Sequence, residues 1–326
     1  MKSKILITGG AGYIGSILTA YLLDHNYDVV VLDDLSTGNE QVVDKRARFI
    51  KASVLDKASL LTALSGITTV IACAAKSLVQ ESLLEPELYH RENTEGMQVL
   101  LNAMKSAQVN QIIFSSTAAV YGDSKIQPIR EGAPTNPVNP YGQSKLAAEE
   151  YISDFCRRGF AGITFRYFNV AVSYKNNMGD LLVENHKDET HLIPRIMKKI
   201  SQNTLNCDIE IYGDKWQTKD GSCVRDYLHV LDLAHAHLLA LESFKRGENQ
   251  VINLGSGAGY SVLEVVDEIQ KVVGHPLNKI FGPARPGDPA SLCASIDKAK
   301  QVLGWQPVAS LTEIVTSSWQ GVKRLG

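Results

Sequence analysis

The sequence TGGAGYIGS, at residues 8–16, constrains the fold of this chain more than any other feature. It contains four glycines in nine residues, Gly9, Gly10, Gly12 and Gly15. They follow directly after an apolar run. Residues 4–8 are expected to form a buried strand and residues 14–24 a helix, so the glycines occupy the turn between them. Such a turn presents backbone amides at the positive end of a helix dipole, where a diphosphate can bind. The alternative is a tight turn that needs glycine for steric reasons alone.

A carboxylate follows at the spacing that a dinucleotide-binding turn requires. Residues 28–32 are the next expected strand, and Asp33 follows directly in the sequence VVVLDDLSTG. An acid about 20 residues beyond the glycines can accept hydrogen bonds from the adenosine ribose hydroxyls. Its charge would repel a 2′-phosphate, so the pattern favours NAD over NADP.

Strands and helices alternate through the first half of the chain. Short apolar runs predict strands at residues 4–8, 28–32, 49–52, 69–74, 111–116 and 163–168. Periodic segments between them predict helices at residues 14–24, 57–64, 87–107 and 141–157. This alternation is typical of an α/β protein with a Rossmann-like, doubly wound parallel sheet covered on both faces.

The pattern changes after Asn169, which predicts a smaller C-terminal α/β lobe. Residues 170–190 are polar and irregular, and beyond them we expect a helix at 192–201, a strand at 210–213, helices at 230–244 and 261–273, and a terminal helix after residue 310. We therefore expect a dinucleotide-binding domain at residues 1–169 and a substrate lobe at mainly 170–326, with parts of 224–256 returning to the first domain. A doubly wound fold places its site at the carboxyl ends of the strands, here between the two lobes.

Composition argues against several classes of function. The 326 residues have a formal net charge of −2 and no basic stripe, so neither nucleic acid nor a membrane surface is an expected partner. No apolar run of about 18 residues and no cleavable leader pattern is found, and a cytoplasmic protein is expected. Five cysteines without a C-x-x-C pair suit reduced thiols, and we expect neither a disulfide framework nor a metal site.

A tyrosine and a lysine four residues apart form a second constellation. Tyr141 and Lys145, in YGQSK, share one face of the helix expected at residues 141–157. A phenol has an ordinary pKa of about 10, and a neighbouring ammonium together with a positive nicotinamide ring would favour the phenolate. Tyr141 would then be a base usable near neutrality, and Thr117, after the strand at 111–116, is placed to hydrogen-bond the reacting oxygen. A core tyrosine beside a solvated lysine is the alternative.

These motifs and others resemble one family. Besides the glycine turn, the chain carries STAAVYG, NPYGQSK, RYFNVAV, ETHLIP and DGSCVRDYLHVLDLAHAH. Together they are similar to the extended short-chain dehydrogenase/reductases, most closely to the UDP-glucose 4-epimerases, over nearly the whole chain. The motifs near the cofactor are shared by the superfamily, whereas residues 220–237 are the specific part. The resemblance implies reversible epimerisation at C4 of a UDP-hexose (UDP-glucose or UDP-galactose) through a transient 4-keto sugar, with NAD bound throughout.

The resemblance also assigns roles to individual residues. It implies that Tyr141 is the catalytic base, that Lys145 anchors the nicotinamide ribose and that Thr117 orients the sugar. The other residues that it places on the NAD side are Gly9, Gly12, Tyr13, Ile14, Gly15, Asp33, Asp34, Thr37, Gly38, Ser53, Val54, Ala74, Ala75, Ser77, Asn93 and Phe168. Those that it places on the UDP-sugar, besides Thr117 and Tyr141, are Asn169, His191, Leu192, Arg225, Asp288 and Leu292.

Two positions depart from the family pattern. The family often has an aspartate for the adenine amine where KASVLD has Ser53, which predicts weaker adenine recognition. Some members carry a lysine at the position of Ser77; Lys76 stands one place early, and that role is not transferred to it.

Other functions of the same fold stay open. A nucleotide-sugar 4,6-dehydratase would need acid and base groups directly after Thr117, where this chain has Ala118 and Ala119. A keto-reductase would share Tyr141 and Lys145 but would need an exchangeable cofactor. An epimerase for UDP-N-acetylglucosamine or a uronic acid is a further possibility, and an NAD-binding regulator would have no need for the base.

Several of these side chains also have structural interpretations. Arg225 suits a diphosphate because its guanidinium forms paired charge-assisted hydrogen bonds, but it could instead pair with Asp226 or Asp232. Asn169 could cap a strand, His191 could begin a helix and Leu292 could belong to the core.

The helices expected at 87–107 and 141–157 have apolar stripes. By resemblance to the family, these helices predict a homodimer joined through a four-helix bundle. The stripe of the first helix is Met97, Leu100, Leu101 and Met104. Packing of that stripe within the core of one protomer is the alternative.

Overall fold

The chain forms two compact units. The computed structural model describes residues 3–172, 174–175, 177–178, 181–182, 191–202, 207–285 and 288–325. The first unit comprises residues 1–122, 134–167 and 234–252, and the second comprises 123–133, 168–233 and 253–326. The expected division did not include the segment 123–133 in the second unit. Much of the stretch 170–190, expected to be irregular, lies outside the described residues.

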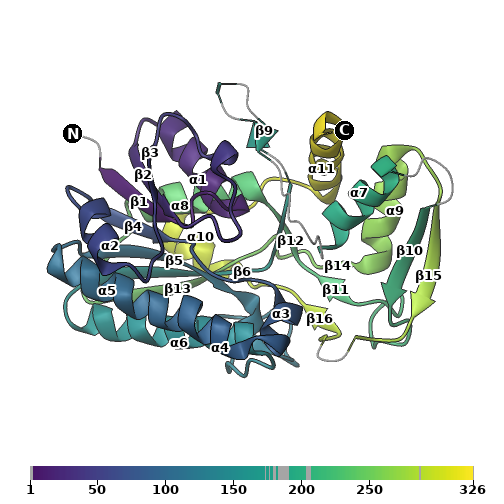
Figure 1. The fold of residues 1–326 in the computed structure, drawn as a ribbon. Coiled ribbons are helices and arrows are strands. Elements are labelled where there is room, and N and C mark those ends of the chain that lie inside the picture. Colours follow the sequence, from purple (N-terminus) through teal and green to yellow (C-terminus); the bar gives the residue numbers. More distant parts are fainter. Residues whose placement is uncertain are drawn as a thin grey trace. The chain divides into compact units, whose positions relative to one another are not determined.

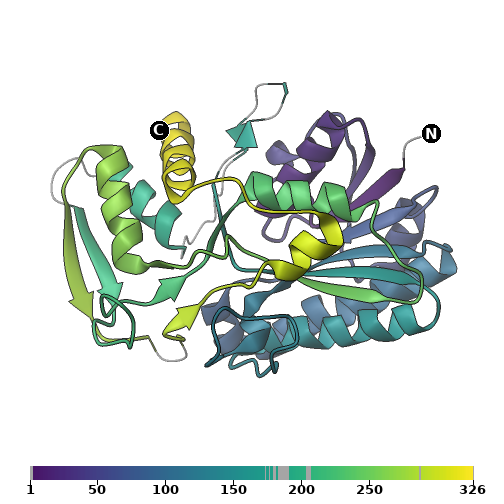
Figure 2. The same ribbon diagram turned by 180° about the vertical axis from the view of Figure 1, so that it is seen from behind.

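A seven-stranded sheet forms the centre of the first unit (Figures 1 and 2). Its strands are β1 (Lys4–Thr8), β2 (Asp28–Asp33), β3 (Arg48–Lys51), β4 (Thr69–Ala72), β5 (Gln111–Thr117), β6 (Ala161–Tyr167) and β13 (Asn249–Leu254). They lie in the order β13-β6-β5-β4-β1-β2-β3, and the ladders from β3 through β6 are parallel. The strand order reverses between β1 and β4, so the α/β fold with a Rossmann-like sheet is confirmed. Strand β13 was not predicted from the sequence.

Helices cover both faces of this sheet. On one face lie α2 (Lys57–Ala63), α5 (Gly96–Ser106) and α6 (Pro140–Arg157), and on the other lie α1 (Tyr13–Asp24) and α8 (Val230–Ala240) (Figures 1 and 2). Helix α2 begins at the carboxylate of Asp56, which accepts hydrogen bonds from the amides of residues 58 and 59. Helix α8 ends four residues before the predicted end at residue 244.

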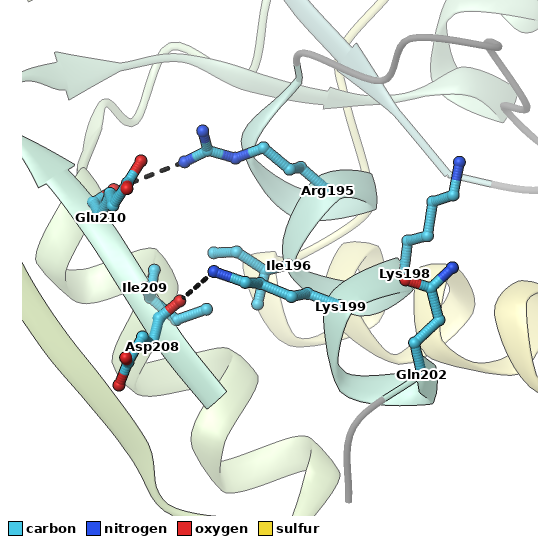
Figure 3. A pocket seen from close by; sticks show the side chains of 8 residues that line it. All are labelled: Arg195, Ile196, Lys198, Lys199, Gln202, Asp208, Ile209 and Glu210. Carbon is cyan, nitrogen blue, oxygen red and sulfur yellow. Dashed lines mark hydrogen bonds between the residues drawn. The ribbon is translucent and has the colours of Figure 1, made fainter. Parts of the chain in front are cut away.

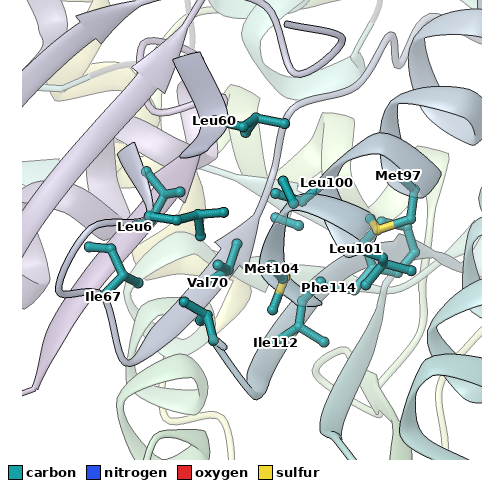
Figure 4. Packing of buried hydrophobic residues seen from close by; sticks show 14 of the residues in the cluster. Leu6, Leu60, Ile67, Val70, Met97, Leu100, Leu101, Met104, Ile112 and Phe114 are labelled. Carbon is teal, nitrogen blue, oxygen red and sulfur yellow. The ribbon is translucent and has the colours of Figure 1, made fainter. Parts of the chain in front are cut away.

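The apolar stripe of α5 belongs to the core of the first unit. Met97, Leu100, Leu101 and Met104 are all buried and pack with side chains of β1, β4 and β5 (Figure 4). Core packing within the protomer, the alternative to the dimer interpretation, therefore accounts for this stripe, because its side chains fill the space between helix and sheet.

The single helix predicted at residues 87–107 is interrupted. It consists of α4 (Pro86–Tyr89), a π-helical turn (His90–Glu95) and α5, and it follows a short helix, α3 (Val79–Leu84). A π turn holds one extra residue, and such turns are frequent at functional sites. This turn carries Asn93 and Thr94, both buried.

The second unit is built from small sheets and four helices among its described residues. β10 (Cys207–Tyr212) pairs with β15 (Leu277–Gly282), β12 (Tyr227–His229) with β7 (Asn169–Ala171), and β11 (Val224–Arg225) lies between β14 (Tyr260–Ser261) and β16 (Ser291–Leu292). Helices α7 (Leu192–Gln202) and α9 (Val262–Val273) pack against α11 (Leu311–Leu325), and α10 (Asp297–Leu303) precedes α11. The remaining short strands are β8 (Tyr174–Lys175) and β9 (Leu181–Leu182).

Candidate active site

The glycine turn between β1 and α1 is shaped partly by steric need. Gly9 has a positive φ of 73°, and a Cβ there would lie 2.5 Å from the amide nitrogen of Ala74. A Cβ on Gly15 would lie 2.1 Å from the carbonyl oxygen of Gly9. Only glycine fits at these two positions because the backbone of the turn approaches itself and the strand next to it so closely.

Gly12 requires a different explanation. The nearest atom that a Cβ on Gly12 would meet is a backbone oxygen 3.4 Å away, which is ordinary contact. Helix α1 begins after Gly12 without a side-chain cap and without an acidic residue in its first turn. The amides at its N-terminus therefore keep the positive end of the helix dipole available for an anion.

Asp33 ties the glycine turn to the second strand. Its Oδ2 accepts a hydrogen bond from the amide of Ala11 (2.9 Å) and its Oδ1 accepts one from Leu35 (2.8 Å). Burial raises the pKa of Asp33, and these two bonds oppose the rise. Each carboxylate oxygen has a second lone pair, so both bonds are compatible with ribose recognition.

The other first-unit residues assigned to the NAD side lie at the carboxyl ends of the strands and in the π turn. Asn93 is the most firmly held: its Oδ1 accepts from the amide of Lys76 (2.8 Å), and its Nδ2 donates to the carbonyl of Lys76 (2.9 Å) and to Ser144 Oγ (3.0 Å). Ser53 Oγ accepts from the amide of Leu55 (3.1 Å). Phe168 falls in the second unit, where its amide donates to the carbonyl of Leu254 (3.0 Å).

Tyr141 and Lys145 lie in the first two turns of α6. The helix begins with Pro140 after Asn139, whose Oδ1 accepts from the amide of residue 142 (2.8 Å). Tyr141 is hydrogen-bonded to Thr117, at the end of β5. The structure thus brings together the three residues that the sequence proposed as catalytic.

Burial shifts the pKa values of both Tyr141 and Lys145. Burial raises the pKa of Tyr141, and the hydrogen bond with Thr117 only opposes this rise. Burial lowers the pKa of Lys145 to about 8, and its Nζ donates to the carbonyl of Ser115 (2.8 Å). The phenolate was expected beside both the ammonium and a bound nicotinamide ring; in the protein without its cofactor, desolvation of the phenol dominates.

A buried polar chain, not anticipated from the sequence, continues from Ser115. Its hydroxyl lies 3.2 Å from Cys73 Sγ and 2.9 Å from the hydroxyl of Tyr167, which in turn lies 2.8 Å from His237 Nε2. Tyr167 is the β6 partner of Thr117 in the parallel ladder. The signal in the sequence was the alternation of β5, which places Ser115 and Thr117 on one face of the strand.

The second unit brings Arg225, Asp288 and Leu292 together. Arg225 Nη1 donates to the carbonyls of Val224 (2.9 Å) and Pro289 (2.8 Å), and Nη2 lies 3.7 Å from Asp288 Oδ1. Leu292 is the β16 partner of Arg225. The ion pair of Arg225 is thus with Asp288.

The two acids considered as partners of Arg225 have other roles. Asp226 accepts hydrogen bonds from the amides of residues 256, 257 and 294, and Asp232 Oδ2 accepts one from the amide of Ala309. Both carboxylates therefore tie together loops of the second unit.

The remaining substrate-side residues lie at the ends of elements. Asn169 begins β7, pairs with Tyr227 of β12 and is hydrogen-bonded to it through its side chain. His191 directly precedes α7, and Leu192 is the first residue of that helix.

A pocket of about 250 Å³ lies between α7 and β10 (Figure 3). Lys199 Nζ donates to the carbonyl of Asp208 (2.6 Å) and Arg195 to that of Glu210 (3.4 Å). The other lining residues are Ile196, Lys198, Gln202 and Ile209, and none of the eight was predicted as a site residue. The Arg285 guanidinium stacks 3.8 Å from the centre of the Tyr212 ring, a contact that was not predicted from the sequence.

Comparison with protein families decides the class of the molecule. A model described as the NAD dependent epimerase/dehydratase family matches residues 5–255. The chain belongs to this family. Over the described residues, no group of three or more side chains could hold a metal ion, and no helix is long and apolar enough to cross a membrane.

Members of the epimerase/dehydratase family match over almost the whole chain. A UDP-glucose 4-epimerase of Corynebacterium glutamicum is 44% identical over 99% of this chain and 97% of its own. The structure of a UDP-glucose 4-epimerase from Bifidobacterium longum in complex with NAD⁺ and UDP is similar, with a TM-score of 0.90, 35% identity and coverage of 99% and 98%. A UDP-glucose 4-epimerase structure from Stenotrophomonas maltophila with bound NAD and formylated UDP-arabinopyranose has a TM-score of 0.92, 31% identity and coverage of 99% and 98%.

The first unit fits the cofactor of this family. The uncapped N-terminus of α1 suits a diphosphate, while Asp33 suits a ribose without a 2′-phosphate. NAD would therefore be held by the glycine turn, Asp33 and Lys145.

Proposed function

We propose that this chain interconverts the C4 epimers of a UDP-hexose, UDP-glucose and UDP-galactose, with NAD retained. The observation that carries the proposal is the hydrogen-bonded pair of Tyr141 and Thr117, with Lys145 one turn along the same helix, in a chain of the NAD dependent epimerase/dehydratase family. The 44% identity to a UDP-glucose 4-epimerase supports this choice among the family's reactions.

The proposed roles of the catalytic residues follow from their chemistry. NAD, when bound, supplies the acceptor and later the donor of the hydrogen at C4. Tyr141 takes the proton of the C4 hydroxyl at its phenolic oxygen and returns it after the keto sugar has turned over. Thr117 holds the reacting oxygen by a hydrogen bond, and Lys145 binds the cofactor ribose while its positive charge favours the phenolate.

We further propose that the second unit binds the UDP-sugar. Both carbonyl bonds of Arg225 are made by Nη1, so Nη2 and Nε are the donors proposed for the diphosphate. Asp288 is proposed for the uridine ribose, and Asn169, His191 and Leu192 for the rest of the nucleotide sugar. Leu292 is proposed to lie beside the hexose because it pairs with Arg225 in the β11–β16 ladder.

A homodimer in the cytoplasm is proposed for the whole protein. The apolar stripe of α5 no longer supports the dimer, but Leu83 and Leu84 of α3 are 53% and 81% exposed, and α3 packs against α6, which exposes Tyr151. Large apolar side chains exposed on consecutive residues, as Leu83 and Leu84 are, support an interface at α3. The five cysteines are all free, which suits a reducing compartment.

The decisive experiment uses the purified protein without added nucleotide. Acid denaturation of the protein should release NAD. Incubation with UDP-glucose, with no added reductant, should produce UDP-galactose, and NMR of the anomeric protons measures the conversion. A keto-reductase would instead consume NADH in proportion to product, and an NAD-binding regulator would leave the sugar unchanged. Either result would contradict the proposal.

A further inference from the structure

One buried carboxylate joins three elements of the active site. Glu149 of α6 accepts a hydrogen bond from Ser116 Oγ (2.5 Å) through Oε1. Arg166 of β6 donates from Nε to Oε1 (3.0 Å) and from Nη2 to Oε2 (2.6 Å). The side chains of Arg166 and Glu149 are 7% and 6% exposed. The pair is thus a two-pronged ion pair shielded from water, with a serine attached.

The positions of these residues in their elements are informative. Ser116 and Arg166 are direct partners in the β5–β6 ladder, so their side chains leave the sheet on the same face. Glu149 follows Lys145 by one helical turn and Tyr141 by two, on the same side of α6. The carboxylate therefore fixes how far α6 can slide or rotate against the two strands.

The threonine of the site is bracketed by the same ion pair. Ser116, which immediately precedes Thr117, is bonded to Glu149. Tyr121, four residues after Thr117, has its ring centre 4.7 Å from the guanidinium carbon of Arg166. The side chains of Ser116 and Tyr121, on either side of Thr117, thus contact the two charged groups.

Resting on the function proposed above, we propose that the Glu149–Arg166 ion pair is a positioning unit that holds Tyr141 and Lys145 of α6 in register with Thr117 of β5. Burying two charges costs free energy of desolvation, and apolar side chains of similar volume are often as stable as a buried ion pair. Apolar side chains cannot supply the directional bonds by which the ion pair and Ser116 join α6, β5 and β6. A shift of about 1 Å at a reacting group can cost about 100-fold in rate.

The charge of Glu149 adds an electrostatic effect that can be measured. Burial lowers the pKa of Lys145 to about 8, while the Cys73 thiol and the Glu149 carboxylate act in the opposite direction. Tyr141 lies on the same face of the helix as Lys145, the Ser115 carbonyl accepts a hydrogen bond from the ammonium, and the centre of the Phe114 ring lies 4.9 Å from Nζ. Removing the negative charge of Glu149 leaves Arg166 uncompensated, so Lys145 should lose its proton at a lower pH.

The test compares three variants with the wild-type protein. Glu149→Gln keeps the shape and removes the charge. Glu149→Leu with Arg166→Met replaces the ion pair by apolar groups, so that no buried charge is left unpaired. Asp44→Asn is the matched control, because it breaks another ion pair of the first unit, that of Arg46 with the buried Asp44 (2.7 Å). Each protein is assayed well below its melting temperature, at equal folded fraction.

We expect Glu149→Gln to lower kcat by about 10- to 100-fold, with KM within about twofold, because the reacting groups are displaced rather than the sugar lost. The apolar double variant should regain thermal stability but not kcat. A double variant that regains wild-type kcat would show that the pair serves stability only. A loss of kcat in Glu149→Gln that is no larger than the loss in Asp44→Asn would show the same. Either result would overturn the inference.

A readout that needs no turnover separates this inference from the proposed function. The titration of Lys145 is followed by NMR of ¹³Cε-labelled lysine and assigned with Lys145→Arg. It should move to lower pH in Glu149→Gln. An inactive wild-type protein would reject the proposed function, and the titration would then decide the inference alone. An unmoved Lys145 titration contradicts it in either case.

Discussion

The fold changes the acid–base chemistry of Lys145. Its ammonium is buried, bonded to the carbonyl of Ser115 and has a pKa of about 8, against 10.5 for an ordinary lysine. The protonated form is the one that can bind a ribose hydroxyl and support a phenolate, so the proposed activity needs the proton in place. We therefore expect kcat/KM to fall as the pH rises through about 8.

Stability should not follow the same course. The unfolded chain keeps this proton up to about pH 10.5, so Lys145 by itself contributes stability that rises with pH between about 8 and 10.5. Melting temperatures measured alongside the rate profile separate the two effects. A kcat/KM that stays constant up to about pH 10 would show that Lys145 does not titrate in the reaction.

Tyr141 is expected to carry the proton transfer alone. Tyr141→Phe removes only the phenolic oxygen, which Thr117 hydrogen-bonds, and should lower kcat by about 10² to 10⁴ with fold and bound NAD retained. Steady-state rates, circular dichroism and NAD content of the same preparation test this. Turnover close to wild type would remove Tyr141 from the mechanism.

Leu292 bears on which sugar is accepted. It is partly buried and pairs with Arg225, and leucine is smaller than tyrosine, so it is expected to leave some room for a C2 substituent. We expect measurable activity on UDP-N-acetylglucosamine, and Leu292→Tyr should depress it selectively, by an amount of about 1 to 3 kcal/mol in transition-state binding. The comparison is kcat/KM for both sugars in both proteins. Equal losses on the two would show that Leu292 does not contact that substituent.

Among the elements, the turn from β1 to α1 allows a prediction without knowledge of the substrate. Gly15→Ala places a Cβ 2.1 Å from the carbonyl oxygen of Gly9, and relief requires the turn to open. We expect the free energy of unfolding to fall by about 1 to 3 kcal/mol. We also expect less NAD to copurify with the protein. Gly132→Ala is the control, because its Cβ meets no atom within 4 Å, and it should change little. Full NAD content in Gly15→Ala would argue that the turn does not hold the diphosphate.

At the scale of the whole molecule, the expected dimer now depends on α3 and α6. Because the stripe of α5 is used within the protomer, the prediction now rests on Leu83, Leu84 and Tyr151, which are among the exposed apolar side chains. We expect a dimeric mass in light scattering at micromolar concentration, and Leu84→Asp should shift it to the monomer, because a buried carboxylate is unpaired in an apolar interface. Val308→Asp is the control, because Val308 is also exposed but belongs to the second unit, and this variant should leave the mass unchanged. A monomeric wild-type protein would contradict the prediction.

The sequence by itself determined the fold class and the proposed catalytic residues. The spacing of apolar residues and the positions of glycine and proline are local properties of the sequence. They were sufficient to predict the strands and helices around the glycine turn, Asp33 at the end of β2, and Tyr141 and Lys145 one turn apart on α6. Strand β13 and the π turn that carries Asn93 were missed, because an edge strand depends on the neighbour it pairs with and a π turn on the contacts of its extra residue.

Only the tertiary structure decided the environment of the proposed catalytic groups. The low pKa of Lys145, the raised pKa of Tyr141, the Asp288 partner of Arg225 and the carboxylate of Glu149 between two strands all depend on residues distant in sequence. The physical reason is that the desolvation and charge interactions that set these properties act through space between side chains that the fold brings together. The same reason explains the stripe of α5, since an apolar helix face does not specify whether its own sheet or a second protomer will cover it.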